Sequence, residues 1–146
     1  MDPDTLEVVT HQKIDTTKHD IKPKWNFIGL EDVRIFRWND ILYVCGVRRD
    51  VKPDGEGRME LCEVNYTHDV CEEVTRDRIE PPVPTYLEKN WMPILDMPMH
   101  FIKWANNLEI AKIDPLTKTS EVVITKDYNL TIPFELRGGT QVIPWK

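Results

Sequence analysis

The chain has 146 residues, of which 40% are hydrophobic and 30% are charged, and its formal net charge is −6. A chain of this length can bury a core of its own, and the composition is that of a globular protein rather than of a disordered one. The acidic balance argues against nucleic acid as a partner, because binding a polyanion requires a basic surface.

The sequence carries no sign of export or membrane insertion. No apolar run approaches the roughly 20 residues that span a bilayer. The segment Met1–Val9 lacks a basic stretch followed by an apolar one, as a signal peptide would have. We therefore expect a cytoplasmic protein with no membrane partner.

Metal-ligand patterns are missing from the sequence as well. Cys45, Cys62 and Cys71 are an odd number of cysteines without metal-ligand spacing, which is typical of reduced thiols. A Cys62–Cys71 disulfide is the alternative. The carboxylates of Asp50–Glu60 do not follow the register of a calcium loop, so they indicate a solvated loop and no metal site.

The first part of the chain alternates between strand-like runs and turn residues, and helical periodicity is scarce. Val33–Trp38 ends at Asn39-Asp40, and Ile41–Val47 follows at once, which predicts a tight hairpin. Arg58–Val64 alternates as a half-buried strand does. Cys71–Val74 predicts a fourth strand before prolines interrupt the pattern.

The same plan then recurs. The predicted strands of the second unit are Trp91–Leu95, Met99–Trp104, Leu108–Ile113 and Ser120–Thr125. A third beginning follows at Gly139–Trp145. The repetition indicates one structural plan used more than once along the chain.

The three beginnings lie near Asp32, Asn90 and Gly138, about 50 to 58 residues apart. Four short strands per repeat at this period are typical of β-propeller blades. The predicted fold is therefore all-β, with repeated four-stranded antiparallel meanders that form two to three blades of a propeller. A β-sandwich or barrel is the alternative, since it also consists of short strands at regular spacing. The units would span residues 26–80, 81–132 and 133–146.

Two or three blades do not close a propeller, which needs at least about four. The expectation is therefore a partial domain of a longer protein, in which Leu6–Val9 belongs to a preceding blade. Sequence beyond Lys146 would then supply the remaining blades. An open array exposes strand edges, through which copies of the chain would self-associate.

Polar residues mark each beginning, where the inner strands of a propeller would converge on one axis. Carboxylates, cations, an amide and an indole around one axis suit a sugar site. A carboxylic acid can protonate a glycosidic oxygen, and aromatic rings pack on sugar rings. The beginnings read Gly29-Leu30-Glu31-Asp32-Val33-Arg34, Glu88-Lys89-Asn90-Trp91 and Leu136-Arg137-Gly138-Gly139-Thr140.

These motifs (GLEDVRIF, EKNW and RGG) resemble those of the five-bladed β-propeller glycosidases. The resemblance is closest to the β-mannoside phosphorylase and hydrolase family, whose motif is Glu-Asp-Pro-Arg, followed one blade later by Lys-Asn. The likeness covers Trp25–Trp145. It implies a five-bladed propeller and an oligosaccharide or glycan as the substrate.

The resemblance also implies an inverting cleavage of a β-glycoside, with Asp32 as the proton donor and phosphate or water as the nucleophile. Glu31 and Arg34 would order Asp32, and Lys89 would meet phosphate or substrate. Inorganic phosphate is thus a candidate co-substrate, and no other cofactor is expected. The remaining residues implied in substrate binding are Asn90, Trp91 and Arg137.

The sequence departs from the family at two points. Val33 stands where the family has proline, and the family's later histidine-bearing phosphate motif would lie beyond Lys146. Loss of that phosphate-binding set would favour hydrolysis, or binding without catalysis.

Structural roles remain open for the same residues. Asp32 and Arg34 lie two apart on a strand and would share a face, so an ion pair between them is an alternative. Turns are alternatives for Lys89-Asn90 and for Arg137, which precedes two glycines. Trp91 is expected in the core before it is expected against a sugar.

Two functions from different classes follow. The first is a glycan-active enzyme, a hydrolase or phosphorylase of mannoside-like substrates, whose activity belongs to the full-length protein. The second is a non-catalytic glycan-binding or scaffolding segment of a larger glycosyltransferase-type protein. A propeller that binds proteins is less favoured, because the beginnings are charged rather than apolar.

Overall fold

The computed structural model describes residues 4–5, 7–8, 10–104, 107–128, 131 and 138–144. Within this part of the chain no helix is long and apolar enough to cross a membrane. The elements are one 3-10 helix, η1 (Thr17–His19), and the strands β1 (Leu30–Trp38), β2 (Ile41–Arg48), β3 (Arg58–Tyr66), β4 (Cys71–Arg78), β5 (Met92–Pro93), β6 (His100–Trp104), β7 (Leu108–Ile113) and β8 (Ser120–Lys126).

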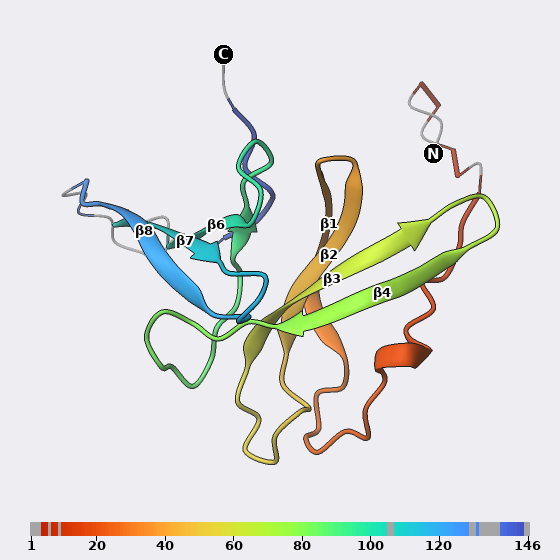
Figure 1. The fold of residues 1–146 in the computed structure, drawn as a ribbon, viewed down its shortest axis with the longest axis horizontal. Helices are drawn as coiled ribbons and strands as arrows, with labels where there is room; N and C mark the ends of the chain where they lie inside the picture. Colours follow the sequence, from red (N-terminus) through yellow and green to blue (C-terminus); the bar gives the residue numbers. More distant parts are fainter. Residues whose placement is uncertain are drawn as a thin grey trace.

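The strands form two sheets of four strands each (Figure 1). The first sheet has the order β1-β2-β3-β4, and the second has the order β5-β6-β7-β8. Every pairing is antiparallel and joins neighbours along the chain, so both sheets are meanders. The predictions of an all-β chain and of repeated four-stranded antiparallel meanders are confirmed.

The hairpin between β1 and β2 has the turn that the sequence predicts. Trp38 pairs with Ile41, which leaves Asn39 and Asp40 as the two turn residues. Their φ angles are 48° and 65°, in the left-handed region. Asn and Asp tolerate this region better than other side chains do, and two left-handed residues match the twist of a tight hairpin.

The core lies between the two sheets and is rich in aromatic rings. The ring centroid of Trp38 lies 4.7 Å from that of Phe36 and 5.3 Å from that of Phe101 on β6, and both pairs are edge-on. Such pairs add about 0.5–1.5 kcal/mol each beyond the buried area. Trp38 also donates from Nε1 to the carbonyl of Ile94 at 2.8 Å, so β1 is joined directly to the second sheet.

A smaller cluster covers the other face of the first sheet. Val44, Cys62 and Val64 are buried there, with Ile14 from the N-terminal segment packed against them. All three cysteines are free, so the alternative of a Cys62–Cys71 disulfide is wrong. Burial raises the pKa of Cys45 to about 12, which keeps this thiol protonated at neutral pH.

The N-terminal segment lies along the outer edge of the first sheet. Asp15 donates its N–H to the carbonyl of Cys71 at 2.7 Å, and its own carbonyl accepts from Glu73 at 2.9 Å. Lys18 forms an ion pair with Glu72 on the same strand, β4. This contact covers a strand edge that would otherwise be open. The predicted Leu6–Val9 strand falls in part outside the described residues.

Residues 138–144 lie beside the first strand of the second sheet. Val142 donates to the carbonyl of Pro93 at 2.8 Å and accepts from the N–H of Leu95 at 3.0 Å, which makes a parallel bridge with Ile94. The predicted third beginning is therefore extended at Val142 and docked on the second unit. Trp145 lies outside the described residues.

Candidate functional site

The beginnings of the three units meet at Arg34 of β1. Its guanidinium donates to three backbone carbonyls: Nη1 to Trp91 at 3.3 Å, Nη2 to Gly138 at 3.2 Å and Nε to Gly139 at 3.1 Å. An arginine has no acceptor, so each of these contacts uses donors that a ligand would otherwise receive. Arg34 therefore joins the three beginnings through their backbone, and carbonyls occupy three of its five N–H donors.

Asp32 lies in a β-bulge near the start of β1. The β1–β2 register shifts between Glu31 and Arg34, so that Asp32 and Val33 bulge opposite Gly46 of β2. Asp32 has a φ of 52°, and its side chain is exposed. The bulge breaks the two-residue alternation on which an Asp32–Arg34 ion pair depended, and that alternative is wrong.

Gly46 leaves the space that the bulge occupies. A Cβ at this position would lie 2.7 Å from the carbonyl oxygen of Glu31, 3.4 Å from Cβ of Leu30 and 3.5 Å from Cγ2 of Val33. Gly46 was not among the residues predicted from the sequence to matter at the site. The signal was present, because a glycine inside a strand pattern often marks a bulge or a close backbone approach.

Gly46→Ala is expected to destabilise the protein by about 1–3 kcal/mol, because the new methyl group must displace the backbone of the bulge. Thermal denaturation measures the loss, and the backbone amide resonances of Asp32 and Val33 should shift. Gly139→Ala is the control, since nothing lies within 4 Å of a Cβ at Gly139. Equal stability and unshifted resonances in Gly46→Ala would contradict the proposed role of the glycine.

The second beginning contains a buried hydrogen-bond cluster around Glu88. This carboxylate accepts from Nε1 of Trp91 at 2.9 Å and from Oγ1 of Thr85 at 2.8 Å, and it lies 3.2 Å from Nζ of Lys103. Trp91 is only 1% exposed and belongs to the core between the sheets. Its ring has no open face on which a sugar could pack. Trp91 is therefore a core residue, as the alternative prediction had it, and not a substrate contact.

The other predicted residues differ in their surroundings. Lys89 is exposed, and Asn90 is half-buried with a φ of 62°, so Asp32 and Asn90 share the left-handed conformation at two beginnings. Glu31 is half-buried, and its Oε1 is buried without a hydrogen-bond partner among the described residues. No hydrogen bond or ion pair joins Asp32 to Lys89 in that part of the chain. Arg137 lies outside the described residues.

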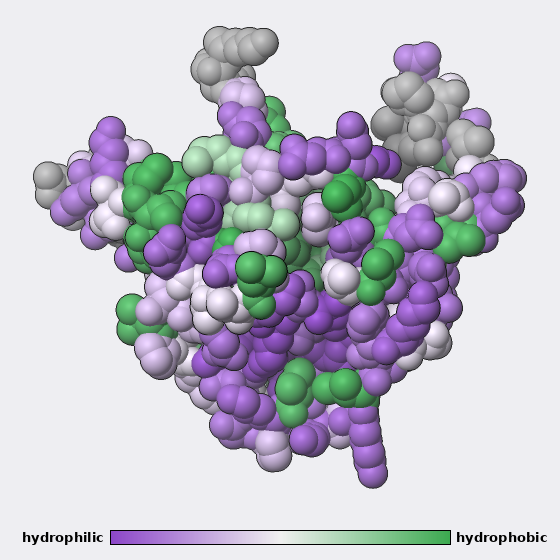
Figure 2. All heavy atoms as spheres, viewed as in Figure 1, coloured by the Kyte–Doolittle hydropathy of each residue, from purple (hydrophilic) through white to green (hydrophobic). Residues whose placement is uncertain are grey.

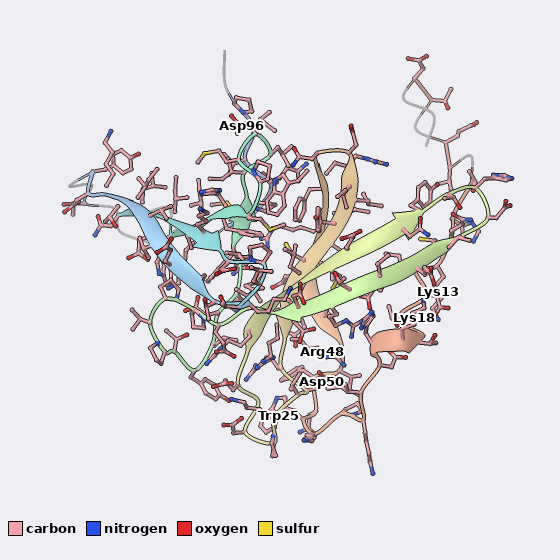
Figure 3. All side chains as sticks on the ribbon, viewed as in Figure 1. Lys13, Lys18, Trp25, Arg48, Asp50 and Asp96 are labelled. Carbon is pink, nitrogen blue, oxygen red and sulfur yellow. The ribbon has the colours of Figure 1, made fainter. Side chains whose placement is uncertain are left out.

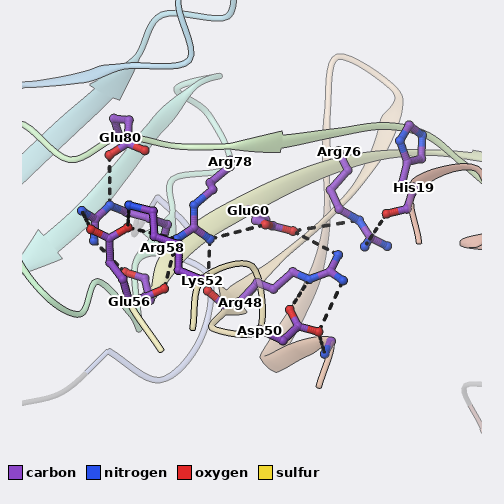
Figure 4. Close-up of polar contacts among 12 residues, drawn as sticks. His19, Arg48, Asp50, Lys52, Glu56, Arg58, Glu60, Arg76, Arg78 and Glu80 are labelled. Atoms are coloured by element: carbon purple, nitrogen blue, oxygen red, sulfur yellow. Dashed lines mark hydrogen bonds and ion pairs between the residues drawn. The ribbon is translucent and has the colours of Figure 1, made fainter. Parts of the chain in front are cut away.

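A buried ionic network lies on the first sheet next to the β1 beginning (Figure 4). Asp50 is 0% exposed and Glu60 is 3% exposed. The prediction that Asp50–Glu60 forms a solvated loop is therefore wrong at both ends. The antiparallel sheet brings arginines from β2 and β4 beside these carboxylates, which offsets part of the cost of burying them. The members of the network are Arg48, Asp50, Lys52, Glu56, Arg58, Glu60, Glu73, Arg76, Arg78 and Glu80.

One pair of this network holds the start of β1 in place. Nε of Arg48 lies 2.6 Å from Oδ1 of Asp50, and Oδ2 of Asp50 accepts from the N–H of Gly29 at 3.0 Å. Burial alone would raise the pKa of Asp50, but the hydrogen bonds from Arg48 and Gly29 outweigh burial and lower it. This pair was not predicted from the sequence, although two residues that are two apart at a strand end can share a face.

The carboxylate of Glu60 has longer polar contacts than that of Asp50. Its carboxylate oxygens lie 3.8 Å from Arg48, 4.0 Å from Arg76 and 3.7 Å from Arg78. Its Oε2 and Nε of Arg76 are both buried without a hydrogen-bond partner among the described residues. Burial raises the pKa of Glu60, and the three guanidiniums do not offset that effect.

The described residues include no group of three or more His, Cys, Asp or Glu side chains that could hold a metal ion. Comparisons with protein-family models, with curated proteins and with solved structures found no match. The geometry of the beginnings and the motifs found there are therefore the observations that bear on function.

Proposed function

We propose that the chain is a partial β-propeller that binds a glycan where its units begin. The observation that carries this proposal is Arg34, whose guanidinium joins the first beginning to Trp91 and to the Gly138-Gly139 pair. In a propeller the corresponding ends of the inner strands surround one axis. Side chains that surround such an axis can contact one ligand from several sides, as a sugar with many hydroxyls requires. The free thiols fit a cytoplasmic location.

Asp32 is the residue that we assign to catalysis. This residue is exposed and has a left-handed backbone, two positions before Arg34, which contacts the other two beginnings. Residues in sparsely populated conformations persist where the surrounding structure enforces them, and they cluster at functional sites. The resemblance of GLEDVR to the glycosidase motif supports the same assignment. Asp32 would give its proton to the glycosidic oxygen while water or phosphate attacks the anomeric carbon with inversion.

Asp32→Asn tests this assignment, because asparagine also tolerates the left-handed conformation but has no acidic proton to give. Turnover of a β-1,4-mannohexaose, measured with and without inorganic phosphate, should fall by about 10²- to 10⁴-fold. Binding of the sugar and the circular dichroism spectrum should stay unchanged.

Asp40→Asn is the matched control for that variant. Asp40 is also exposed and left-handed, with a φ of 65°, but it lies at the opposite end of β1 in the hairpin turn. Its substitution should leave turnover as in the wild type. Equal turnover in Asp32→Asn and the wild type would reject Asp32 as the acid.

Glycan binding without turnover is the second candidate function. The observation that favours it is that Arg34, which the resemblance implies would order Asp32, donates instead to backbone carbonyls of the other two beginnings. Binding of the hexasaccharide by a wild-type protein that releases no product would favour this function over cleavage.

A further inference from the structure

Two exposed aromatic rings flank an arginine on the loops next to the candidate site. Phe27 is 53% exposed and Tyr86 is 55% exposed. The guanidinium carbon of Arg49 lies over both rings, 5.4 Å from the centroid of Phe27 and 6.0 Å from that of Tyr86. Arg49 thus covers part of each ring by a cation–π contact, and about half of each side chain remains open to a ligand.

Hydrogen bonds hold this cluster in one arrangement. Arg49 donates from Nε to the carbonyl of Gly55 at 3.0 Å and from Nη2 to the hydroxyl of Tyr86 at 3.4 Å. That hydroxyl donates in turn to the carbonyl of Asp54 at 2.5 Å. Trp25 packs against Gly55, where a Cβ would lie 2.5 Å from Cε2 of the indole. The rings are therefore positioned before a ligand arrives, which lowers the entropic cost of binding.

The cluster lies beside the first beginning, where Leu30 pairs with Arg48, and close along the chain to the second. Phe27 precedes β1, Arg49 follows β2, and Tyr86 precedes β5. Figure 3 places Trp25, Arg48 and Asp50 together at the lower end of the view and Asp96, which follows β5, at the upper end. In Figure 2 hydrophilic residues cover much of the lower part of this face, with a small hydrophobic group among them near the bottom.

We propose that Phe27, Arg49 and Tyr86 form a second sugar-binding site, which takes a neutral pyranose ring of a glycan chain. The apolar face of a pyranose can pack on the open aromatic surface, and the remaining N–H groups of Arg49 can donate to its hydroxyls. The inference rests on the proposed function, because it places this ring in the same glycan that reaches Asp32.

Calorimetric titration of the full chain with β-1,4-mannohexaose and with cellohexaose tests the site. Phe27→Ala and Tyr86→Ala should each weaken binding about fivefold to tenfold, as expected for the loss of one aromatic contact. Tyr66→Ala is the control. Tyr66 is 52% exposed, but it ends β3 about 27 Å along the strand from Arg58. The Tyr66→Ala variant should bind both hexasaccharides as the wild type does.

The outcomes separate the two proposals. If the wild type binds and both Phe27→Ala and Tyr86→Ala bind equally well, the second site is wrong and the glycan function stands. If Tyr66→Ala weakens binding as much as they do, the aromatic cluster has no special role, and the second site is again wrong. If the wild type binds neither hexasaccharide, the proposed glycan function fails, and the second site fails with it.

Discussion

Arg48→Met is expected to lower the free energy of unfolding by about 3–5 kcal/mol, a large share of the roughly 5–15 kcal/mol that stabilises a typical domain. The substitution keeps a long unbranched side chain but leaves Asp50 as an unpaired charge at 0% exposure. Only backbone N–H groups, such as that of Gly29, would remain as its hydrogen-bond donors. Urea denaturation followed by tryptophan fluorescence measures the loss.

Two controls separate the buried charge from a simple packing defect. Glu60→Gln removes a charge from the same network, but Glu60 has no close hydrogen bond, so the cost should be about 1 kcal/mol or less. Asp50→Asn in the Arg48→Met background should restore part of the lost stability, because an amide leaves no unpaired charge. If Arg48→Met were no more costly than Glu60→Gln, the pair would not be the stabilising unit that we infer.

The pH dependence of unfolding checks the same pair. The lowered pKa of Asp50 contributes stability that is present above its ordinary value of 3.8 and is lost as the pH falls through the folded value. Without Arg48, burial would raise that pKa instead, and ionisation of Asp50 would destabilise the variant as the pH rises. The penalty of Arg48→Met should therefore shrink when the pH is lowered below 3.8.

Gly138→Ala is expected to destabilise the protein by about 2–4 kcal/mol, through steric overlap and lost hydrogen bonds. A Cβ at this position would overlap the carbonyl oxygen of Asn90 and lie 2.9 Å from Cγ of Met92. The backbone cannot relieve the overlap easily, because the next carbonyl, that of Trp91, already accepts from Arg34. The third beginning should therefore separate from β5.

Hydrogen exchange locates that separation. The amides of Val142 and Leu95, which bond to the carbonyls of Pro93 and Val142, should lose protection in Gly138→Ala. Gly139→Ala is the matched control from the adjacent position, where a Cβ meets nothing within 4 Å and the φ angle is not left-handed. It should change stability by no more than about 0.5 kcal/mol. Full protection of both amides in Gly138→Ala would refute the docking.

The sequence was sufficient to predict the strands, because the patterns that indicate a strand or a turn are local. The limits predicted for Leu108–Ile113 match β7, and those for Ser120–Thr125 fall one residue short of β8. Turn residues such as Asn39-Asp40 and alternating side chains act over a few positions, so they can be read without knowing the fold. The strand predicted at Cys71–Val74 was too short, because β4 continues through charged residues to Arg78. The ion pairs of Arg76 and Arg78 explain why these charged residues belong to the sheet.

The candidate site could be predicted only in outline. The sequence identified Asp32, Arg34 and the glycine pair as members of corresponding beginnings, because a repeat places corresponding residues at corresponding ends. It could not show that Arg34 is used by carbonyls of Trp91, Gly138 and Gly139, which lie 57 to 105 positions away. Nor could it show the bulge at Asp32, because the space for that bulge comes from a neighbouring strand.

The amino-acid sequence by itself thus determined that the chain is all-β and that its strands form repeated meanders. Local alternation and turn chemistry are sufficient for that result. Tertiary structure alone decided which polar residues remain available to a ligand. Burial and hydrogen bonding depend on partners brought from distant parts of the chain, as Arg34 and Glu60 show. Asp32 stays exposed because Gly46 lets the strand bulge, whereas Trp91 is buried between two sheets.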